Sequence, residues 1–414
     1  MNQQLIEMGK RAQQAANQLA LVATVAKNDA LNQMADALLA NADQIIAANQ
    51  ADMVNATKMP TKFQDRLMLN QQRIVGMADE LRHVAILQDP TTKIDRGWIT
   101  KDGLQIIQQR VPLGVIGMIY EARPNVTSGA SALTFKSGNA VILRGGKEAL
   151  RTNQAVVKVL RQVLTSSGLP VNAIQLIEDT SHQVAQELME LDQYVDVIIP
   201  RGSHRLIQAV VKNATVPVIE TGAGNCHLYV DRDADLTKAT PIIINAKTQR
   251  PSVCNAAEKL LVHQDVAAHF LPSIISQLRQ HGVEVRGDER VRQIVPDVKA
   301  ASDEEWDTEY DDLIMAVKVV DSLDQAIDHI NRHSTHHSEA IITEDGERGR
   351  QFQRRVNSAV VYVNASTRFT DGGEFGFGAE IGISTQKLHA RGPMGLDQLT
   401  TIKYEVTGNG QVRK

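Results

Sequence analysis

Short runs of apolar and β-branched residues alternate with helix-length segments over residues 111–363, and this alternation constrains the fold most. A parallel strand pair needs a crossover of about a dozen or more residues, usually a helix, so the pattern predicts parallel sheets covered by helices. The first series comprises VILR at 141, AIQLIED at 173, VDVIIP at 195 and VPVIE at 216. The second series, after Gly224, comprises HLYV at 227, KLLVH at 259, LIMAVKVV at 313, AIIT at 340 and VVYVN at 360. Two α/β units are therefore expected.

The segments outside this alternation read differently. Apolar residues in the first ninety positions recur at steps of three and four, which predicts helices that pack through one face. These residues are Leu5, Met8, Ala12, Ala15, Ala16 and Leu19, then Leu31, Met34, Ala35, Leu38, Ala42 and Ile45. GLQIIQQRV from 103 and the terminal TIKYEVTGNGQVRK are strand-like, and neither has an obvious partner in its own unit. Because unpaired strand edges are usually covered, we expect an arm that pairs with another subunit.

Composition excludes several classes of protein. The 414 residues are 43% hydrophobic, which is enough for a large core and excludes a disordered or fibrous chain. A net charge of -4 disfavours general nucleic-acid binding. The chain has no secretory leader pattern and no apolar run near the roughly 18 residues that span a bilayer. Two cysteines, Cys226 and Cys254, exclude a disulfide framework and a four-ligand cysteine zinc site, so a reducing, cytoplasmic compartment is expected.

Two glycine-containing turns follow predicted strands and precede predicted helices. Backbone N–H groups at such turns, with nearby cations, suit a phosphate. The first turn contains Arg144, Gly145, Gly146 and Lys147, and the second contains Pro200, Arg201, Gly202 and Ser203. Neither matches a G-x-G-x-x-G or Walker motif, so ordinary βα turns remain the alternative. Placed on neighbouring strands, the two turns would favour a dinucleotide.

Cys254 is the candidate nucleophile. It lies in TQRPSVCNAAEKL, beside Arg250 and small residues, and a nearby positive charge makes a thiol reactive. A buried inert thiol, the commoner case for a single cysteine, is the alternative. Cys226, in GNCHLYV, fits a buried inert thiol better. The histidines at 329, 333, 336 and 337 raise the question of a metal, but no H-E-x-x-H motif is present and NRHSTHHSEAI reads as a loop.

Together these segments resemble the aldehyde dehydrogenase superfamily, and within it the glutamyl phosphate reductases. The resemblance covers nearly the whole chain. It is carried by YEARPNVT at 120, VILRGGKEA at 141, VIETGAGNCHLYVD at 218, QRPSVCNAAEKLLVH at 249 and NRHSTHHSEAI at 331, the last with the preceding VVDSLDQAIDHI. The final segment is similar to the stretch that distinguishes this family, which assigns its histidines to a signature and not to a metal site. The implied fold is α/β and aldehyde dehydrogenase-like, with two Rossmann-like parallel-sheet domains and a small β oligomerisation arm.

The resemblance also implies domain boundaries. The nucleotide-binding domain would comprise residues 1–97, 113–222 and 377–395, and the catalytic domain with the nucleophilic cysteine residues 223–376. Residues 98–112 and 396–414 would form the oligomerisation arm.

Three catalytic residues are carried over from the family. Cys254 is the nucleophile, and Asn125 in RPN supplies a side-chain amide to an oxyanion hole. Glu220 precedes Cys254 by 254 minus 220, or 34, residues, as in the superfamily. In aldehyde oxidation a glutamate there activates water, a step that biosynthetic reduction does not need, so a structural or proton-relay role for Glu220 is the alternative.

The implied cofactor is NADPH. Many members that prefer NAD place a glutamate on the turn that follows Arg144, whereas this chain has Gly145, Gly146 and Lys147. A cation in place of an acid removes repulsion toward a 2'-phosphate. Arg201 is the next residue that could read that phosphate.

The implied reaction is reduction of L-glutamyl 5-phosphate to L-glutamate 5-semialdehyde and phosphate, in L-proline biosynthesis. Candidate substrate-binding residues are Arg123, Arg250, Ser366, Thr367 and Arg368. A homo-oligomer is expected, and a transient association with the glutamate 5-kinase that makes the substrate is left open. The alternatives are an NAD-dependent dehydrogenase of free aldehydes and an inactive scaffold of the same fold.

Overall fold

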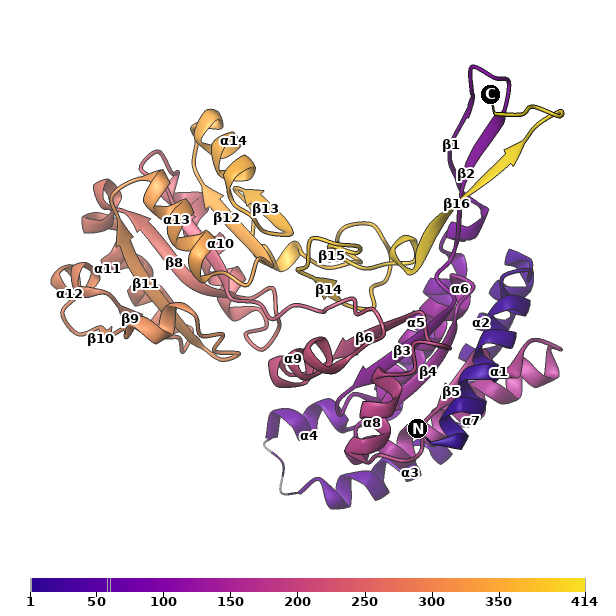
Figure 1. Cartoon of the computed structure of the whole chain (residues 1–414). Helices are drawn as coiled ribbons and strands as arrows, with labels where there is room; N and C mark the ends of the chain where they lie inside the picture. Colours follow the sequence, from indigo (N-terminus) through magenta and orange to yellow (C-terminus); the bar gives the residue numbers. More distant parts are fainter. Residues whose placement is uncertain (1, 58, 60, 414) are drawn as a thin grey trace. The chain divides into compact units, whose positions relative to one another are not determined.

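The computed structural model describes residues 2–57, 59 and 61–413, and the chain forms two compact units (Figure 1). The first unit comprises Met1–Glu220, Gly376–Gly382 and Met394–Lys414. The second comprises Thr221–Phe375 and Ile383–Pro393.

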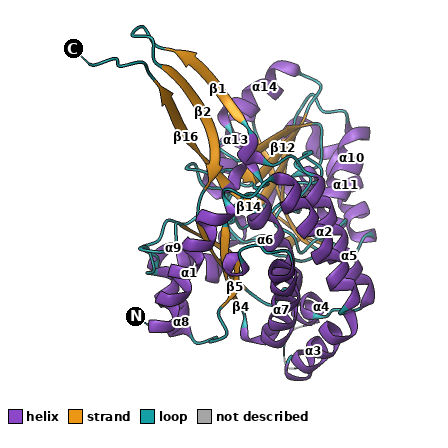
Figure 2. Ribbon diagram, turned by 90° about the vertical axis from the view of Figure 1, so that its right-hand side faces the viewer, coloured by secondary structure: helices purple, strands orange, loops and turns teal. Residues whose placement is uncertain are grey.

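The first unit is built on a four-stranded parallel sheet with the strand order β5-β4-β3-β6. The strands are β3 (Val115–Tyr120), β4 (Ala140–Gly145), β5 (Ile174–Leu176) and β6 (Val197–Arg201). Helices α6 (Pro124–Lys136) and α7 (Leu150–Ser166) cover one face, and α1 (Gln3–Leu19), α8 (His182–Met189) and α9 (His204–Asn213) cover the other (Figure 2). The central strand β3 was not among the expected runs, although each of its residues is buried. Of the expected run VPVIE, only Val218 pairs, in an isolated bridge to Ile198.

Further helices of the first unit form an outer layer over α6 and α7 (Figure 2). They are α2 (Thr24–Ala40), α3 (Ala42–Asn55), α4 (Thr61–Leu67) and α5 (Gln71–Ile86). The predicted apolar faces are confirmed: Leu5 and Leu19 of α1 and Leu31 and Leu38 of α2 are buried. The face expected from Leu31 to Ile45 spans two helices, because α2 ends at Ala40 and α3 begins at Ala42, with Asn41 as the cap residue between them.

A three-stranded antiparallel sheet extends from the first unit (Figures 1 and 2). Its strands are β1 (Ile94–Ile99), β2 (Gln105–Pro112) and β16 (Thr400–Thr407), in the order β1-β2-β16. The two strand-like runs of the sequence pair with each other, with Thr400 opposite Pro112 and Thr407 opposite Gln105. The expectation that neither has a partner in its own unit was therefore wrong, because the partners come from distant parts of the chain.

The second unit contains a seven-stranded parallel sheet with the order β10-β9-β11-β8-β7-β12-β13. The strands are β7 (Cys226–Val230), β8 (Ala257–His263), β9 (Glu284–Gly287), β10 (Lys299–Ala300), β11 (Ile314–Val320), β12 (Ser338–Ile342) and β13 (Val360–Val363). The helices are α10 (Leu236–Thr248), α11 (Gln264–Gln280), α12 (Glu289–Ile294), α13 (Leu323–His333) and α14 (Gly346–Arg355). A short pair, β14 (Ile383–Ser384) and β15 (Gly392–Pro393), completes the unit.

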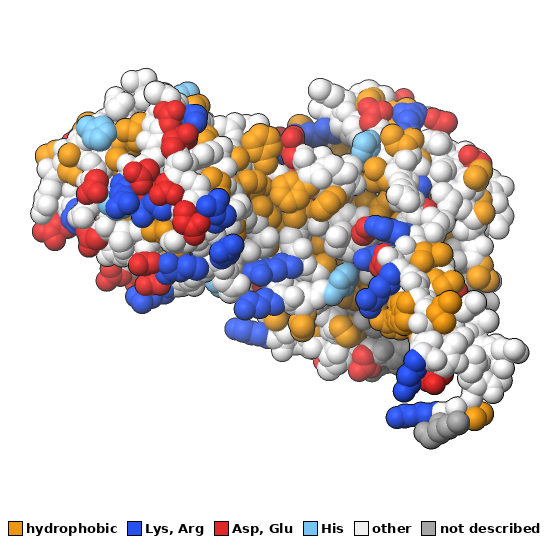
Figure 3. Space-filling view, turned by 90° about the horizontal axis from the view of Figure 1, so that it is seen from above, with side chains coloured by type: hydrophobic (Ala, Val, Ile, Leu, Met, Phe, Trp, Pro, Cys, Tyr) orange, Lys and Arg blue, Asp and Glu red, His pale blue; other side chains and the backbone are white. Residues whose placement is uncertain are grey.

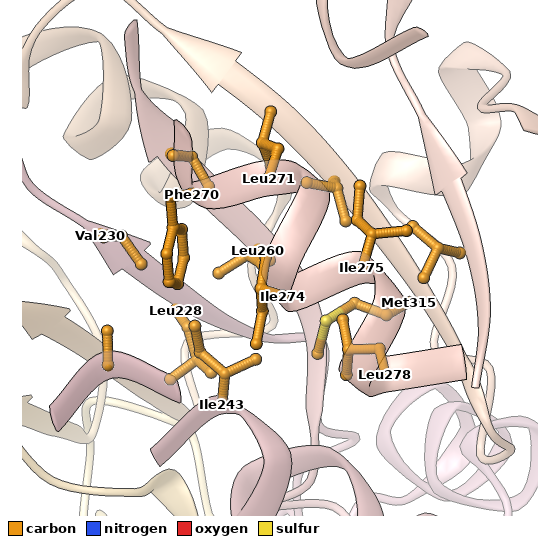
Figure 4. Close-up of a cluster of buried hydrophobic side chains, with 14 of the residues drawn as sticks. Leu228, Val230, Ile243, Leu260, Phe270, Leu271, Ile274, Ile275, Leu278 and Met315 are labelled. Atoms are coloured by element: carbon orange, nitrogen blue, oxygen red, sulfur yellow. The ribbon is translucent and has the colours of Figure 1, made fainter. Parts of the chain in front are cut away.

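Alternate residues of each central strand enter two apolar cores. Leu228 and Val230 of β7 pack with Phe270 and Ile274 of α11 (Figure 4). Tyr229, between them, points to the opposite face, where its ring lies 6.4 Å from that of Phe352. The strands are thus buried on both faces, which explains their continuous apolar sequences.

The charged side chains are mixed in sign over the left-hand part of the face in Figure 3. This distribution agrees with the nearly balanced numbers of acidic and basic residues in the chain. Among the described residues, no helix is both long enough and apolar enough to cross a membrane.

Candidate active site

Cys254 lies in a loop of the second unit, residues 249–256, that joins α10 to β8. Lys247, at the end of α10, and Glu258, at the start of β8, close the base of this loop with a fully buried ion pair of 3.1 Å. Burial raises the pKa of Glu258 to about 7 and lowers that of Lys247, while their mutual attraction opposes both shifts. Removing one partner of such a pair costs about 3–5 kcal/mol, so the pair anchors the loop.

The backbone of Gly224 touches the backbone of Cys254. A Cβ on Gly224 would lie 1.4 Å from the Cys254 carbonyl oxygen and 2.6 Å from its Cα, so only glycine fits. The Gly224 N–H donates to Oε1 of Glu309 at 2.6 Å. Burial is the main cause that raises the pKa of Glu309 to about 7. Sequence analysis missed Glu309, which no motif marks.

The segment after β13 holds the other side of the loop. The Thr367 hydroxyl donates to the carbonyl of Asn255 at 2.7 Å, and Nε of Arg368 donates to Oε1 of Gln249 at 3.0 Å. The Arg368 guanidinium also donates to the side chain of Asn255. Ser366 caps the short helix Thr367–Phe369 by accepting the Arg368 N–H. The hydroxyls of Ser366 and Thr367 therefore already serve the fold.

Arg368 lies in the electrostatic neighbourhood of both Arg250 and Cys254. Burial lowers the pKa of Arg368, Arg250 lowers it further, and Cys254 acts in the opposite direction. The structure thus brings Arg368 to the loop in which the sequence already placed Arg250 beside Cys254. A positive charge beside a thiol favours its reactive, ionised form.

A cavity of about 190 Å³ opens beside this segment. It is lined by Asn245, Gln249, Arg368, Phe369, Asp371 and Glu374. The lining offers one guanidinium and two carboxylates, charges of both signs that a zwitterionic group needs.

The two predicted phosphate turns lie at the carboxyl ends of parallel strands in the first unit's sheet. Tyr120, at the end of β3, is in register with Gly145 of β4 and with Arg201 of β6. The expectation that the turns sit on neighbouring strands was wrong, because β3 lies between β4 and β6.

At the first turn, other groups approach the glycine backbone closely. A Cβ on Gly146 would lie 2.5 Å from Oε2 of Glu148 and 3.5 Å from the nitrogen of Ala122, so the Glu148 carboxylate lies beside this glycine. Arg144 donates to the carbonyl of Thr180 at 2.7 Å, and its Nε is buried without a hydrogen-bond partner. Burial lowers the pKa of Arg144, against the attraction of Glu148 and Asp179. Lys147 is exposed at the start of a short 3-10 helix.

The second turn already holds an internal anion. Oε2 of Glu121 accepts the N–H of Ser203, and Oε1 accepts its hydroxyl, both at 2.8 Å. A Cβ on Gly202 would lie 2.8 Å from the same carboxylate. Both donors of Ser203, the cap residue of α9, are therefore engaged by Glu121, which sequence analysis missed although it lies in the quoted segment YEARPNVT.

The remaining predicted site residues lie in the first unit. Asn125 is the exposed second residue of α6, Pro124 is the first, and Arg123 is the preceding cap residue. Proline at that position favours the start of a helix, because its missing N–H is not needed there. Oε1 of Glu220 accepts Nε2 of Gln208 from α9 at 3.2 Å.

The signature histidines do not share one helical face. Helix α13 ends at His333 and β12 begins at Ser338, so only residues 334–337 of the predicted loop NRHSTHHSEAI lie between regular elements. His329 instead packs against His227 and His333, with ring centroids 5.6 and 4.5 Å away. Burial lowers the pKa of His329 to about 2, so it is neutral. Within the described part of the chain, no three His, Cys, Asp or Glu side chains are arranged to hold a metal ion.

Comparison with known proteins decides the family. Residues 2–307 match the model of the aldehyde dehydrogenase family. The chain belongs to the aldehyde dehydrogenase family. The predicted aldehyde dehydrogenase-like fold is thereby confirmed.

Within this family, several relatives matched over their full length are gamma-glutamyl phosphate reductases. The gamma-glutamyl phosphate reductase of Limosilactobacillus reuteri (strain DSM 20016) is 70% identical, covering 100% of both chains. That of Lactiplantibacillus plantarum is 62% identical over 99% of both. The crystal structure of gamma-glutamyl phosphate reductase from Thermotoga maritima has a TM-score of 0.97 at 50% identity, covering 99% of this chain and 100% of that one. An acetylating aldehyde dehydrogenase from Geobacillus thermoglucosidasius shares the fold, with a TM-score of 0.71 at 17% identity over 100% of this chain and 98% of that one.

We expect Gly224→Ala to destabilise the protein, because its methyl group overlaps the Cys254 backbone. Overpacking of this kind costs roughly 1–3 kcal/mol in the free energy of unfolding, measured by denaturant titration. Gly76→Ala is the matched control. A Cβ there meets nothing within 4 Å, and alanine inside helix α5 should add about 0.5–1 kcal/mol. A Gly224→Ala protein as stable as the parent would contradict the close approach.

Proposed function

We propose that this chain catalyses the NADPH-dependent reduction of L-glutamyl 5-phosphate to L-glutamate 5-semialdehyde and phosphate, the second step of L-proline biosynthesis. The names of the full-length relatives support this reaction. The observation that carries it is the setting of Cys254, a partly exposed thiol in an anchored loop beside Arg250 and Arg368. Two cations next to a nucleophile suit an acyl phosphate, whose leaving group is an anion.

The proposed reaction proceeds through an acyl enzyme on Cys254. The Cys254 thiolate attacks the acyl carbon, a C–S bond forms, and the bond to the phosphate oxygen breaks. Arg250, with Arg123, would stabilise the departing phosphate. The side-chain amide of Asn125 and the Cys254 N–H would hold the oxyanion, where one lost donor typically costs about 2.7–4 kcal/mol. A nicotinamide cofactor, when bound, would supply the hydride for reduction of the thioester. Breaking of the C–S bond would then release the aldehyde and restore the Cys254 thiolate.

For the cofactor phosphates, we propose the first glycine turn. The support for this turn is Lys147, which is exposed and could receive a 2'-phosphate. The space beside Gly145 is taken by Asn153 and Tyr120, and that beside Gly146 by the carboxylate of Glu148. Arg201, Gly202 and Ser203 have a weaker claim than the sequence indicated, because Glu121 already accepts both donors of Ser203.

For the amino acid end of the substrate, we propose the cavity beside Arg368. Its guanidinium would pair with the α-carboxylate, while Asp371 and Glu374 offer acceptors to the ammonium group. Ser366 and Thr367 would shape this region through the backbone contacts that they already make.

We propose that the β1-β2-β16 sheet is the arm of a homo-oligomer. Strand β2 is paired on both sides, whereas β1 and β16 are the sheet's outer strands and carry exposed Trp98, Ile99, Tyr404 and Val406. A second copy of the chain would cover such an edge. The two free thiols fit a reducing compartment, for which we propose the cytoplasm, and a transient contact with the glutamate 5-kinase would suit an unstable substrate.

The reverse reaction tests the proposed function. Purified protein given L-glutamate 5-semialdehyde and NADP⁺ should form NADPH only when inorganic phosphate is present, because phosphate must cleave the thioester. A dehydrogenase of free aldehydes would form the acid without phosphate. Cys254→Ala should abolish the activity, whereas full activity in that variant would refute the acyl-enzyme route.

Lys147→Glu tests the cofactor assignment. The reversed charge should raise the KM for NADPH about tenfold and that for NADH much less, which corresponds to about 1.4 kcal/mol directed at the 2'-phosphate. Lys158→Glu on α7 makes the same charge change at another exposed lysine and should leave both values unchanged. Equal losses for both cofactors in Lys147→Glu would place recognition of the 2'-phosphate elsewhere.

Arg368→Ala tests the amino acid subsite. The KM for L-glutamate 5-semialdehyde should rise about tenfold or more, since hydrogen bonds to charged groups contribute about 1.5–3 kcal/mol, while the KM for NADP⁺ stays unchanged. Arg350→Ala, which breaks an exposed ion pair on α14, is the control. An unchanged KM for the semialdehyde would remove Arg368 from the subsite.

A further inference from the structure

The thiol of Cys226 contacts the backbone of Cys254, the proposed nucleophile. Its Sγ is 3.2 Å from the carbonyl oxygen of Cys254 and donates to it. Cys226 is the first residue of β7 and is fully buried, so it lies outside the reach of substrate. No sequence pattern connects the two cysteines, and the proposed reaction uses only one of them.

The surroundings keep this thiol in the form that can donate. Burial, followed by the negative charge of Glu339, raises the pKa of Cys226 well above its usual value. Nδ1 of His337 lies 3.9 Å from the Cys226 sulfur and 2.8 Å from the Ser338 hydroxyl. The S–H is therefore retained and has the Cys254 carbonyl as its acceptor.

The contacts continue from Cys226 back to the residue beside the nucleophile. The Ser338 hydroxyl donates to Oγ1 of Thr370 at 2.7 Å. The carbonyl of Thr370 accepts Nδ2 of Asn255 at 2.8 Å. Because Asn255 follows Cys254, the peptide group between them is held from the Cys226 side and from the Thr370 side. These contacts form a ring of residues, in which every member except Cys254 is at least nine-tenths buried. The ring comprises Cys226, His337, Ser338, Thr370, Asn255 and Cys254.

The residues on either side of Cys226 are held by hydrogen bonds to the signature segment, residues 331–341. The backbone N–H of Asn225 donates to Oγ1 of Thr335 at 2.9 Å, and its side chain donates to the carbonyl of His333 at 2.7 Å. The N–H of His227 donates to Oε2 of Glu339 at 2.6 Å. The start of β7 therefore cannot shift without breaking buried hydrogen bonds to residues 333–339.

We propose that Cys226 is a positioning residue for Cys254, whose hydrogen bond to the Cys254 carbonyl fixes the peptide plane from which the nucleophilic sulfur projects. This inference rests on the proposed role of Cys254 as the nucleophile. It also assigns a task to the signature segment, which holds the donor in place. A nucleophile displaced by about 1 Å can lose about 10²-fold in rate, so a contact that removes this freedom affects turnover more than binding.

The test compares Cys226→Ala with Cys226→Ser. The two replacements have nearly the same size, but only serine can donate to the Cys254 carbonyl. We expect Cys226→Ala to lower kcat about tenfold with unchanged KM for L-glutamate 5-semialdehyde, and to change the pH dependence of Cys254 alkylation by iodoacetamide. Cys226→Ser should restore both toward the parent values. Val230→Ala, a buried deletion on the same strand outside the ring, should lower stability without changing kcat.

Two results would overturn the inference. One is a parental kcat in Cys226→Ala, and the other is an equal loss of kcat in the alanine and serine variants, which would indicate packing and not donation. If Cys226→Ala does not fold, Cys226→Ser decides, because parental kcat supports the donor role and lost kcat refutes it. Full activity in Cys254→Ala would instead defeat the proposed function, so the two failures are distinguishable.

Discussion

The direct contact between the Gly224 and Cys254 backbones is the constraint on which the candidate active site depends. Because Gly224 has no side chain, the backbone of the segment that enters β7 packs directly against the backbone of the loop that leads to β8. The donors on that segment then reach groups that a bulkier residue would push away. The Gly224 N–H reaches Glu309, and the Cys226 thiol reaches the Cys254 carbonyl.

Around this contact, hydrogen bonds and an ion pair hold the loop in place, whereas apolar packing holds the rest of the second unit together. The Lys247–Glu258 ion pair closes the base of the loop, and Thr367 and Thr370 hold Asn255 on its far side. Buried polar contacts of this kind specify one geometry, because each is costly to leave unsatisfied. The apolar cores on the two faces of the sheet hold the strands to which this loop is attached.

An acyl phosphate is already activated toward attack by a nucleophile. Its reaction therefore depends more on the placement of the thiol and on nearby positive charge than on a strong acid or base. The site matches this demand, with an anchored thiol, two guanidinium groups and a cavity that carries charges of both signs. In the first unit, Lys147 is exposed at the first glycine turn, while Glu121 accepts the N–H and the hydroxyl of Ser203 at the second.

The alternation of strands and helices, the helical first ninety residues and the candidate status of Cys254 are determined by the sequence alone, because periodicity and the residues beside a thiol are local properties. The same is true of the glycine turns and of the proline that begins α6. Only the tertiary structure decided that β2 pairs with β16, that β3 separates the two turns and that Glu121 occupies the start of α9. It alone placed Cys226 behind Cys254. These contacts join residues far apart in the chain, and nothing in the local pattern of either partner encodes the distance between them.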